Sequence, residues 1–139
     1  MKPKAQPGDT ASRSRRVTSR DIERFTELSG DRNPIHYDEE LAAQTPFGGI
    51  VVQGGVTTAI LNAVVAEDLP GPGSVFLQLD LRFLAAVHPG DTITGTVEVT
   101  SVREDKPVTE LDVRVERDDG TLAVEGHAVC YTVPLPQAP

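Results

Sequence analysis

The sequence predicts a single α+β domain in which a long antiparallel β-sheet wraps around one central helix. Between residues 74 and 132, apolar and polar side chains alternate with the period of two that is typical of half-buried strands. Residues 54–66 are apolar on almost every side, as expected of a helix buried beneath such a sheet. A chain of 139 residues can form one substantial hydrophobic core but not two.

The beginning of the chain predicts a tail followed by an exposed strand. Residues 1–10 are rich in Pro, Gly and Lys, so we expect a flexible N-terminal tail, with the folded domain covering residues 11–135. A basic cluster follows the tail, which we interpret as a solvated strand or arm, and it consists of Arg13, Arg15, Arg16 and Arg20.

The first predicted helix begins at Thr18, whose hydroxyl can cap it with Asp21 in a capping-box arrangement, and it ends at Gly30. Its apolar face is predicted to consist of Ile22, Phe25 and Leu28.

Two more helices are predicted before the strands. A short one opens at Asp38, which can cap residues 39–43. The third covers residues 54–66. Its many β-branched residues also suit a strand, but its length and the preceding glycines favour a helix. The Pro- and Gly-rich sequence at residues 69–73 ends it.

Four strands are predicted after the third helix, separated by turn sequences at residues 88–91, 105–107 and 118–120. Their predicted buried positions, in chain order, are Val75, Leu77, Leu79, Leu81 and Phe83; Ile93, Val97 and Val99; Leu111, Val113 and Val115; and Leu122, Val124, Ala128 and Cys130.

Charge and composition argue against several classes of function. A formal net charge of −8 argues against nucleic-acid binding, which requires a basic surface. No apolar run approaches the length of a membrane span, so we expect no membrane insertion. The single cysteine, Cys130, cannot form an internal disulfide, which fits a cytoplasmic protein. His36, His88 and His127 lack the spacing of metal ligands, so we expect no metal site. We expect no cofactor either.

Asp31 and His36 are the strongest candidates for catalysis. They lie five positions apart across an Asn33-Pro34 turn, and Pro34 restricts both its own backbone and that of Asn33. A rigid turn of this kind can hold a carboxylate and an imidazole toward one cavity, where the two groups can activate a water molecule.

Gly54 and Gly55 precede the apolar helix. A helix N-terminus has unpaired N–H groups that can stabilise an anion, and glycine lets a substrate approach the backbone closely. A simple tight turn explains the two glycines equally well.

Together these motifs resemble the MaoC-like hydratases, the hot-dog-fold (R)-specific enoyl-CoA hydratases. The resemblance extends from about Val17 to Val133. It rests on the sequence Ser29-Gly30-Asp31-Arg32-Asn33-Pro34-Ile35-His36, on Ile50-Val51-Val52-Gln53-Gly54, and on Arg103-Glu104-Asp105-Lys106-Pro107.

The resemblance implies a hot-dog fold and a homodimer, or a higher homo-oligomer, whose sheets join edge to edge. It implies reversible hydration of a trans-2-enoyl thioester of CoA or acyl carrier protein to the (R)-3-hydroxyacyl thioester. Asp31 and His36 would be the catalytic pair and the Gly54 N–H the oxyanion donor. CoA would be part of the substrate, and the predicted substrate-binding residues are Asn33, Gln53, Gly55, Asn62, Arg82, Arg103 and Lys106.

The chain departs from the family pattern at three of these positions. Gln53 stands where members usually have His, Gly55 where a larger apolar residue is common, and Asn62 where a small hydroxyl residue is common. Gln can form hydrogen bonds but cannot titrate. Asn62 could donate to the catalytic carboxylate or shorten the acyl pocket. Two alternatives stay open. A hot-dog acyl-thioesterase would also activate a water molecule but direct it at the thioester carbonyl, although Asn33-Pro34-Ile35-His36 favours a hydratase. A non-catalytic acyl-thioester-binding or partner subunit stays open because of Gln53.

Overall fold

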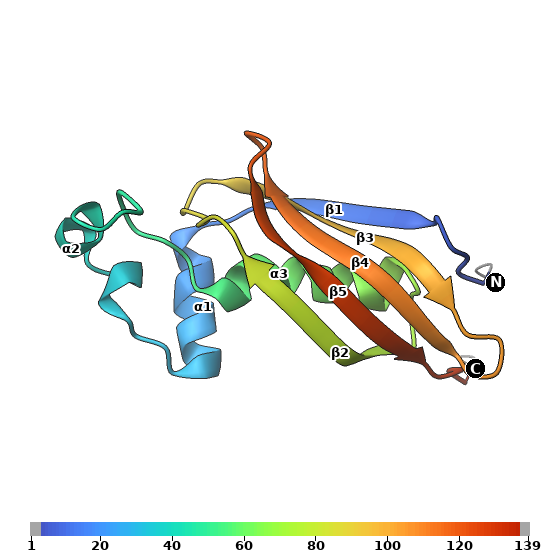
Figure 1. Cartoon of the computed structure of the whole chain (residues 1–139). Coiled ribbons are helices and arrows are strands. Elements are labelled where there is room, and N and C mark those ends of the chain that lie inside the picture. Colours follow the sequence, from blue (N-terminus) through green and yellow to red (C-terminus); the bar gives the residue numbers. More distant parts are fainter. Residues whose placement is uncertain (1–3, 137–139) are drawn as a thin grey trace.

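The structure, a computed structural model, describes residues 4–136. Its five strands form one antiparallel sheet in the order β1-β3-β4-β5-β2: β1 (Thr10–Arg16), β2 (Ser74–Phe83), β3 (Thr92–Val102), β4 (Val108–Arg117) and β5 (Leu122–Thr132). The sheet lies across helix α3 (Gly54–Ala63), which continues into the π-helical turn η2 (Val64–Asp68) (Figure 1). The predicted fold class is confirmed.

The core lies between α3 and the inner face of the sheet. The positions predicted to be buried in the three central strands are buried, among them Ile93, Val97, Leu111 and Val124. The exception is Leu122 at the start of β5, which is only half-buried. Cys130 is also buried there, and burial raises the pKa of its thiol to about 11.

A cytoplasmic location stays a prediction. No helix within residues 4–136 has the length and apolarity that a membrane crossing requires.

The N-terminal segment pairs with the sheet before β1 begins. The Gly8 N–H donates to the Val99 carbonyl at 2.9 Å, and the Val99 N–H donates to the Asp9 carbonyl at 2.9 Å. The predicted solvated strand is confirmed, since β1 is an exposed edge strand. Residues 1–3 of the predicted tail lie outside the described residues, and flexibility of residues 4–10 stays a prediction.

Helix α1 (Ser19–Ser29) begins where the sequence predicts, because the Thr18 N–H donates to Asp21 Oδ2 at 2.9 Å. Ile22 and Phe25 pack into the core as predicted. The prediction for Leu28 was wrong: this side chain is 81% exposed. It lies on the last turn of α1, beyond the side chains that contact the core.

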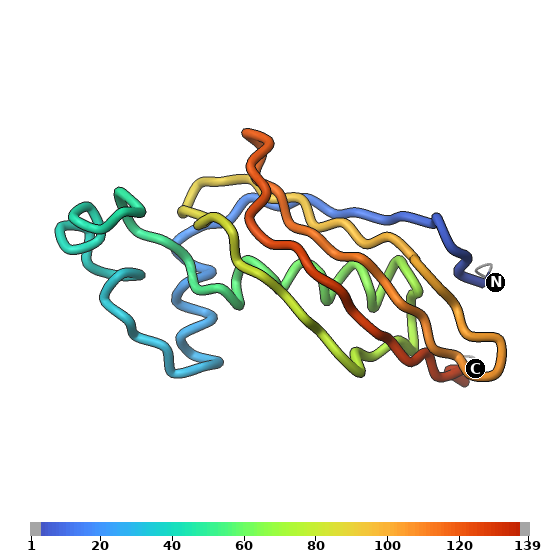
Figure 2. Tube along the Cα trace, viewed as in Figure 1, coloured from blue at the N-terminus to red at the C-terminus, as the bar shows by residue number. Residues whose placement is uncertain are grey.

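Residues 30–50 extend past the end of the sheet (Figure 2) and contain η1 (Pro34–His36) and α2 (Glu39–Ala43). As predicted, Asp38 caps α2, its Oδ1 accepting from the Leu41 N–H at 3.1 Å. Contacts with distant residues hold the segment, among them the hydrogen bond from the Val51 N–H to the Ile35 carbonyl at 3.3 Å and the 3.0 Å contact of His88 Nε2 with the Phe47 carbonyl oxygen.

The predicted alternation in β2 is only partly right. The register against β5 shifts between Phe76 and Gln78, which inserts one extra residue and reverses the facing of the later β2 side chains. Phe76 and Leu81 therefore pack against the core. The other predicted positions were wrong, since Val75, Leu77, Leu79 and Phe83 are all exposed on this edge strand. A one-residue bulge in an edge strand leaves no mark on a simple alternation pattern.

Candidate active site

Asp31 is held by its own backbone and by one carboxylate oxygen. Its N–H donates to Ser29 Oγ at 3.1 Å, and its carbonyl accepts from Thr26 Oγ1 at 2.8 Å. The Asn33 N–H donates to Asp31 Oδ1 at 3.0 Å. These contacts occupy one carboxylate oxygen and leave the other, Oδ2, to face His36.

His36 is held from the opposite side. Its N–H donates to the Asn33 carbonyl at 3.0 Å, and its ring Nδ1 lies 2.6 Å from the Val51 carbonyl oxygen. A carbonyl can only accept, so Nδ1 carries the hydrogen and Nε2 has the free lone pair in the neutral imidazole. The ring is buried, so this orientation is fixed by the protein rather than by solvent.

The structure brings the two predicted catalytic side chains together, with His36 Nε2 3.6 Å from Asp31 Oδ2. This separation is too long for a direct hydrogen bond. Each atom can instead accept a hydrogen bond from one shared water molecule. The Asp31 side chain is 36% exposed against 7% for His36, so the pair is accessible from the carboxylate side.

Gly54 is the first residue of α3 and is exposed. The Val56 and Thr57 N–H groups donate to the Gln53 carbonyl and so close the first turn of the helix. The N–H of a first helical residue has no acceptor inside its own helix, so the Gly54 N–H can donate to a ligand. A Cβ at Gly54 would lie 3.0 Å from the Phe83 ring, so glycine lets this aromatic side chain of β2 lie over the helix start.

Gly55 has a packing role. A Cβ at this position would lie 2.1 Å from the Phe25 ring, so glycine is required for α1 and α3 to approach each other. Its predicted contact with substrate stays a prediction.

Three further predicted substrate-binding residues have different surroundings. Asn33 Oδ1 accepts from the Ile35 N–H at 3.3 Å, which caps η1. The Gln53 side chain is 2% exposed, and its Nε2 donates to the Ile22 carbonyl at 3.1 Å, so it is bonded to α1. Asn62 is exposed on α3, about two helical turns beyond Gly54.

The three basic residues among the predicted substrate-binding residues, Arg82, Arg103 and Lys106, do not lie beside Asp31 and His36 within one chain. Arg82 pairs with Glu125 on the face of the sheet that points away from α3. Arg103 pairs with Asp105 at 2.6 Å in the β3–β4 turn, which lies at the opposite end of the sheet from α1 (Figure 1). Arg103 and Lys106 line a groove of about 930 Å³ there, together with Lys4, Val102, Val133 and Leu135.

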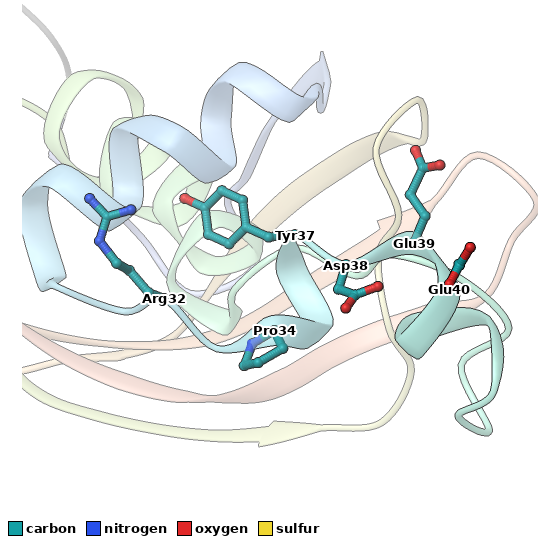
Figure 3. A pocket seen from close by; sticks show the side chains of 6 residues that line it. All are labelled: Arg32, Pro34, Tyr37, Asp38, Glu39 and Glu40. Atoms are coloured by element: carbon teal, nitrogen blue, oxygen red, sulfur yellow. The ribbon is translucent and has the colours of Figure 1, made fainter.

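Two hollows flank the candidate pair. A cavity of about 570 Å³ reaches His36 between α1, α2 and the β2–β3 connection, and is lined also by Ile22, Tyr37, Ile50 and His88. A second hollow lies on the outer surface of the same segment and is shown in Figure 3; it is lined by Arg32, Pro34, Tyr37, Asp38, Glu39 and Glu40. Within residues 4–136, no three His, Cys, Asp or Glu side chains are placed to hold a metal ion.

Sequence reasoning missed three residues that shape the site: Thr26, Tyr37 and Val51. Thr26 and Tyr37 contact each other through their hydroxyls, and Val51 contributes only its carbonyl. A buried threonine in the middle of an amphipathic helix is a weak signal for a polar contact, and a backbone carbonyl leaves no signal at all.

Comparison with known proteins places this geometry in a family. The MaoC like domain matches residues 3–121 of the chain. The chain belongs to the MaoC-like family. Among its relatives, the (R)-specific enoyl-CoA hydratase of Aeromonas caviae is 39% identical over 122 residues, which cover 88% of this chain and 91% of that protein.

Solved structures of MaoC-like relatives share the fold. The (R)-hydratase of A. caviae superposes with a TM-score of 0.88 at 37% identity, covering 93% of this chain and 98% of that one. An R-hydratase of Pseudomonas aeruginosa superposes with a TM-score of 0.85 at 32% identity, covering 97% of this chain and 90% of that one. A mitochondrial 3-hydroxyacyl-[acyl-carrier-protein] dehydratase of Solanum lycopersicum is 26% identical over 134 residues, which are 95% of this chain and 80% of that protein.

Proposed function

We propose that the protein hydrates trans-2-enoyl thioesters to (R)-3-hydroxyacyl thioesters and catalyses the reverse dehydration. The observation that carries the proposal is the 3.6 Å separation of His36 Nε2 and Asp31 Oδ2, with the other polar atom of each side chain already bonded to the backbone. Each side chain therefore presents one acceptor to the same small volume. The names of the relatives agree with this reaction.

The pair orients water as well as activating it. With Asp31 ionised and His36 neutral, both facing atoms are acceptors, so one water donates both of its hydrogens to them. Its remaining lone pairs then point away from the pair, toward the substrate C3. Asp31 acts as general base and takes one proton as the oxygen–C3 bond forms.

Addition at C3 moves the electron pair of the double bond toward the thioester, whose oxygen becomes an enolate oxygen. The Gly54 N–H, at the positive end of α3, donates to this oxygen, which is more charged in the transition state than in the ground state. The proton taken from water then returns to C2, the enolate collapses to the thioester, and the pair is restored to its starting state.

The thioester donor is CoA or acyl carrier protein, as the names of the A. caviae and S. lycopersicum relatives suggest. Cations suited to CoA phosphates are present at Arg103 and Lys106, but they lie at the far end of the protomer from Asp31. They can serve a site only if a second copy of the chain brings them to it.

We also propose a homodimer joined at β2. The two edges of the sheet differ: β1 presents arginines, whereas β2 presents exposed apolar side chains, namely Val75, Leu77, Leu79 and Phe83. An exposed apolar edge strand tends to pair with another strand, whereas a charged one resists pairing. Because Phe83 lies over Gly54, the same interface would adjoin the helix start.

The test is the loss of ultraviolet absorbance of the conjugated enoyl thioester, with crotonyl-CoA and a longer enoyl-CoA. Wild type should turn over, whereas Asp31→Asn and His36→Ala should each lose at least about 100-fold in kcat while remaining folded. Asp112 and His127 form a matched control pair, 3.4 Å apart on the outer face of the sheet. Asp112→Asn and His127→Ala should keep wild-type turnover.

A thiol-specific reagent in the same reaction tests the alternatives. Release of free CoA without 3-hydroxyacyl product would indicate a thioesterase instead. A folded wild-type protein that leaves both CoA and carrier-protein enoyl thioesters unchanged would contradict the proposal and favour a binding or partner subunit.

A further inference from the structure

Three polar side chains from separate segments meet behind the Asp31–His36 turn. Gln53, the residue before Gly54, donates from Nε2 to the Ile22 carbonyl at 3.1 Å and to Thr26 Oγ1 at 3.3 Å. Thr26 Oγ1 in turn contacts the Tyr37 hydroxyl and lies 2.8 Å from the Asp31 carbonyl oxygen. Figure 3 shows the Tyr37 hydroxyl directed toward α1.

The direction of every hydrogen bond in this cluster follows from chemistry. The Asp31 carbonyl can only accept, so it takes the single Thr26 hydroxyl hydrogen. Thr26 Oγ1 must then accept from both of its other partners, which makes the Tyr37 hydroxyl and Gln53 Nε2 the donors. Thr26 thereby uses its one hydrogen and both lone pairs, and no alternative arrangement satisfies the cluster.

Gln53 is suited to this place by its two donor hydrogens. One serves the Ile22 carbonyl and the other serves Thr26, so the amide cannot be flipped without placing its oxygen against a carbonyl. The cost is visible: Gln53 Oε1 is buried, with no hydrogen-bond partner within residues 4–136. The residue thus retains an unpaired acceptor in order to supply a pair of donors.

We propose that Gln53 and Thr26 are positioning residues that fix the Asp31–His36 turn relative to the start of α3. This inference rests on the proposed function, because it assigns the cluster to that same site. Gln53 is bonded through its backbone to Gly54, and through Thr26 it holds the Asp31 carbonyl. The general base and the oxyanion donor come from different elements, and these hydrogen bonds form one path between them, alongside the contacts of Ile35 and His36 with Val51.

The physical reason for such a link is the precision that catalysis requires. A misplacement of reacting groups by 1 Å can lower the rate by about 100-fold. Asp31 is in a turn beyond α1, and its other contacts, to Ser29 and Asn33, are with residues only two positions away. The Thr26 hydroxyl connects it to the packed part of the molecule.

The experiment compares Thr26→Val, which keeps the shape of the side chain but removes the hydroxyl, with Thr26→Ser, which keeps the hydroxyl. Gln53→Met removes the two donors at similar length. With crotonyl-CoA, Thr26→Val and Gln53→Met should each lower kcat by about tenfold or more, with KM within about twofold of wild type. Thr26→Ser should stay within about threefold of wild-type kcat.

The double variant provides the second part of the test. If Gln53 acts through Thr26, Gln53→Met should cost far less in the Thr26→Val background than in wild type. Additive losses, an unchanged kcat in Thr26→Val, or an equal loss in Thr26→Ser would overturn the proposal.

A measurement without substrate separates this inference from the proposed function. Amide NMR signals of residues 31–36 should shift and broaden in Thr26→Val, stay near wild type in Thr26→Ser, and leave the sheet signals unchanged in both. If wild type shows no turnover, the proposed function fails. These signals then still test whether the Thr26 hydroxyl holds the Asp31–His36 turn. Unchanged signals of residues 31–36 in Thr26→Val would overturn the proposal that Thr26 and Gln53 fix this turn.

Discussion

His36 and Val51 are joined by a 2.6 Å contact between the imidazole Nδ1 and the Val51 carbonyl oxygen, and this contact decides which ring nitrogen faces Asp31. Neutral His36 should therefore be the Nδ1–H tautomer. Long-range ¹H–¹⁵N NMR of the imidazole should show Nε2 as the unprotonated nitrogen of the neutral ring. His127, which faces two carboxylates on the outer sheet surface, is an internal reference in the same spectrum. An Nε2–H tautomer for His36 would contradict the assigned water geometry.

The two glycines at the start of α3 should respond differently to alanine. Helix propensity alone favours Ala over Gly by about 1 kcal/mol. Gly55→Ala should nevertheless lower the free energy of unfolding by about 1–3 kcal/mol, because its Cβ would overlap the Phe25 ring inside the core. Gly54→Ala should change it by less than about 1 kcal/mol, since the exposed Phe83 ring can move. Urea unfolding measures the free energy of unfolding of both variants. Equal changes in the two would show that the Phe25 ring can also move.

Acid should selectively weaken the N-terminus of α1. Burial opposes ionisation of Asp21, but the Thr18 N–H and the Arg15 guanidinium hold the pKa of its carboxyl below the ordinary value. A lowered pKa stabilises the fold above the unfolded-state pKa of about 4, and this stabilisation disappears as pH falls through the folded-state value.

Asp21→Asn isolates the charge, because the amide oxygen can still accept from Thr18. The variant should have a lower Tm than wild type at pH 7, by an amount equivalent to about 1 kcal/mol or less, and the difference should shrink as the pH is lowered below about 4. Thermal unfolding followed by circular dichroism at both pH values is the measurement. A Tm difference that persists at low pH would mean that Asp21 acts through packing rather than charge.

A charge on the β2 edge should disrupt self-association. Leu77 is 59% exposed on this edge, and Leu77→Lys should shift the molecular mass measured by light scattering from dimer toward monomer. Ser12→Lys, which adds the same charge to the exposed β1 edge, should leave the dimer intact. A monomeric wild type at micromolar concentration would rule out this interface.

Asn62 should influence the length of acyl chain that is accepted. If its side chain limits the pocket along α3, Asn62→Ala should raise kcat/KM for a longer enoyl-CoA by about tenfold relative to crotonyl-CoA, the range expected for one or two methylene groups. Crotonyl-CoA measured with the same variant is the internal control. An equal change with both substrates would indicate instead that Asn62 donates to the Asp31 carboxylate or supports folding.

Much of the architecture could be predicted from local patterns. The inward-facing residues of β4, and those of β3 as far as Val99, recur at every second position. The Thr18–Asp21 and Asp38 caps lie next to the helices they begin. The errors occurred where a local pattern depends on distant contacts. Leu28 has the helical spacing of a core residue but lies beyond the core, and the bulge after Phe76 changes which β2 residues face α3.

The sequence by itself determined the local shape of the Asp31–His36 turn, because Asn33 and Pro34 restrict their own backbone and Asp31, Asn33 and Ile35 bond to near neighbours. Only the tertiary structure decided how that turn is oriented and where it is anchored. His36 depends on a carbonyl 15 residues away, and Gln53 reaches α1 across 31 residues. Hydrogen bonds between distant segments depend on how the helices and sheet pack, so no spacing along the chain could predict them.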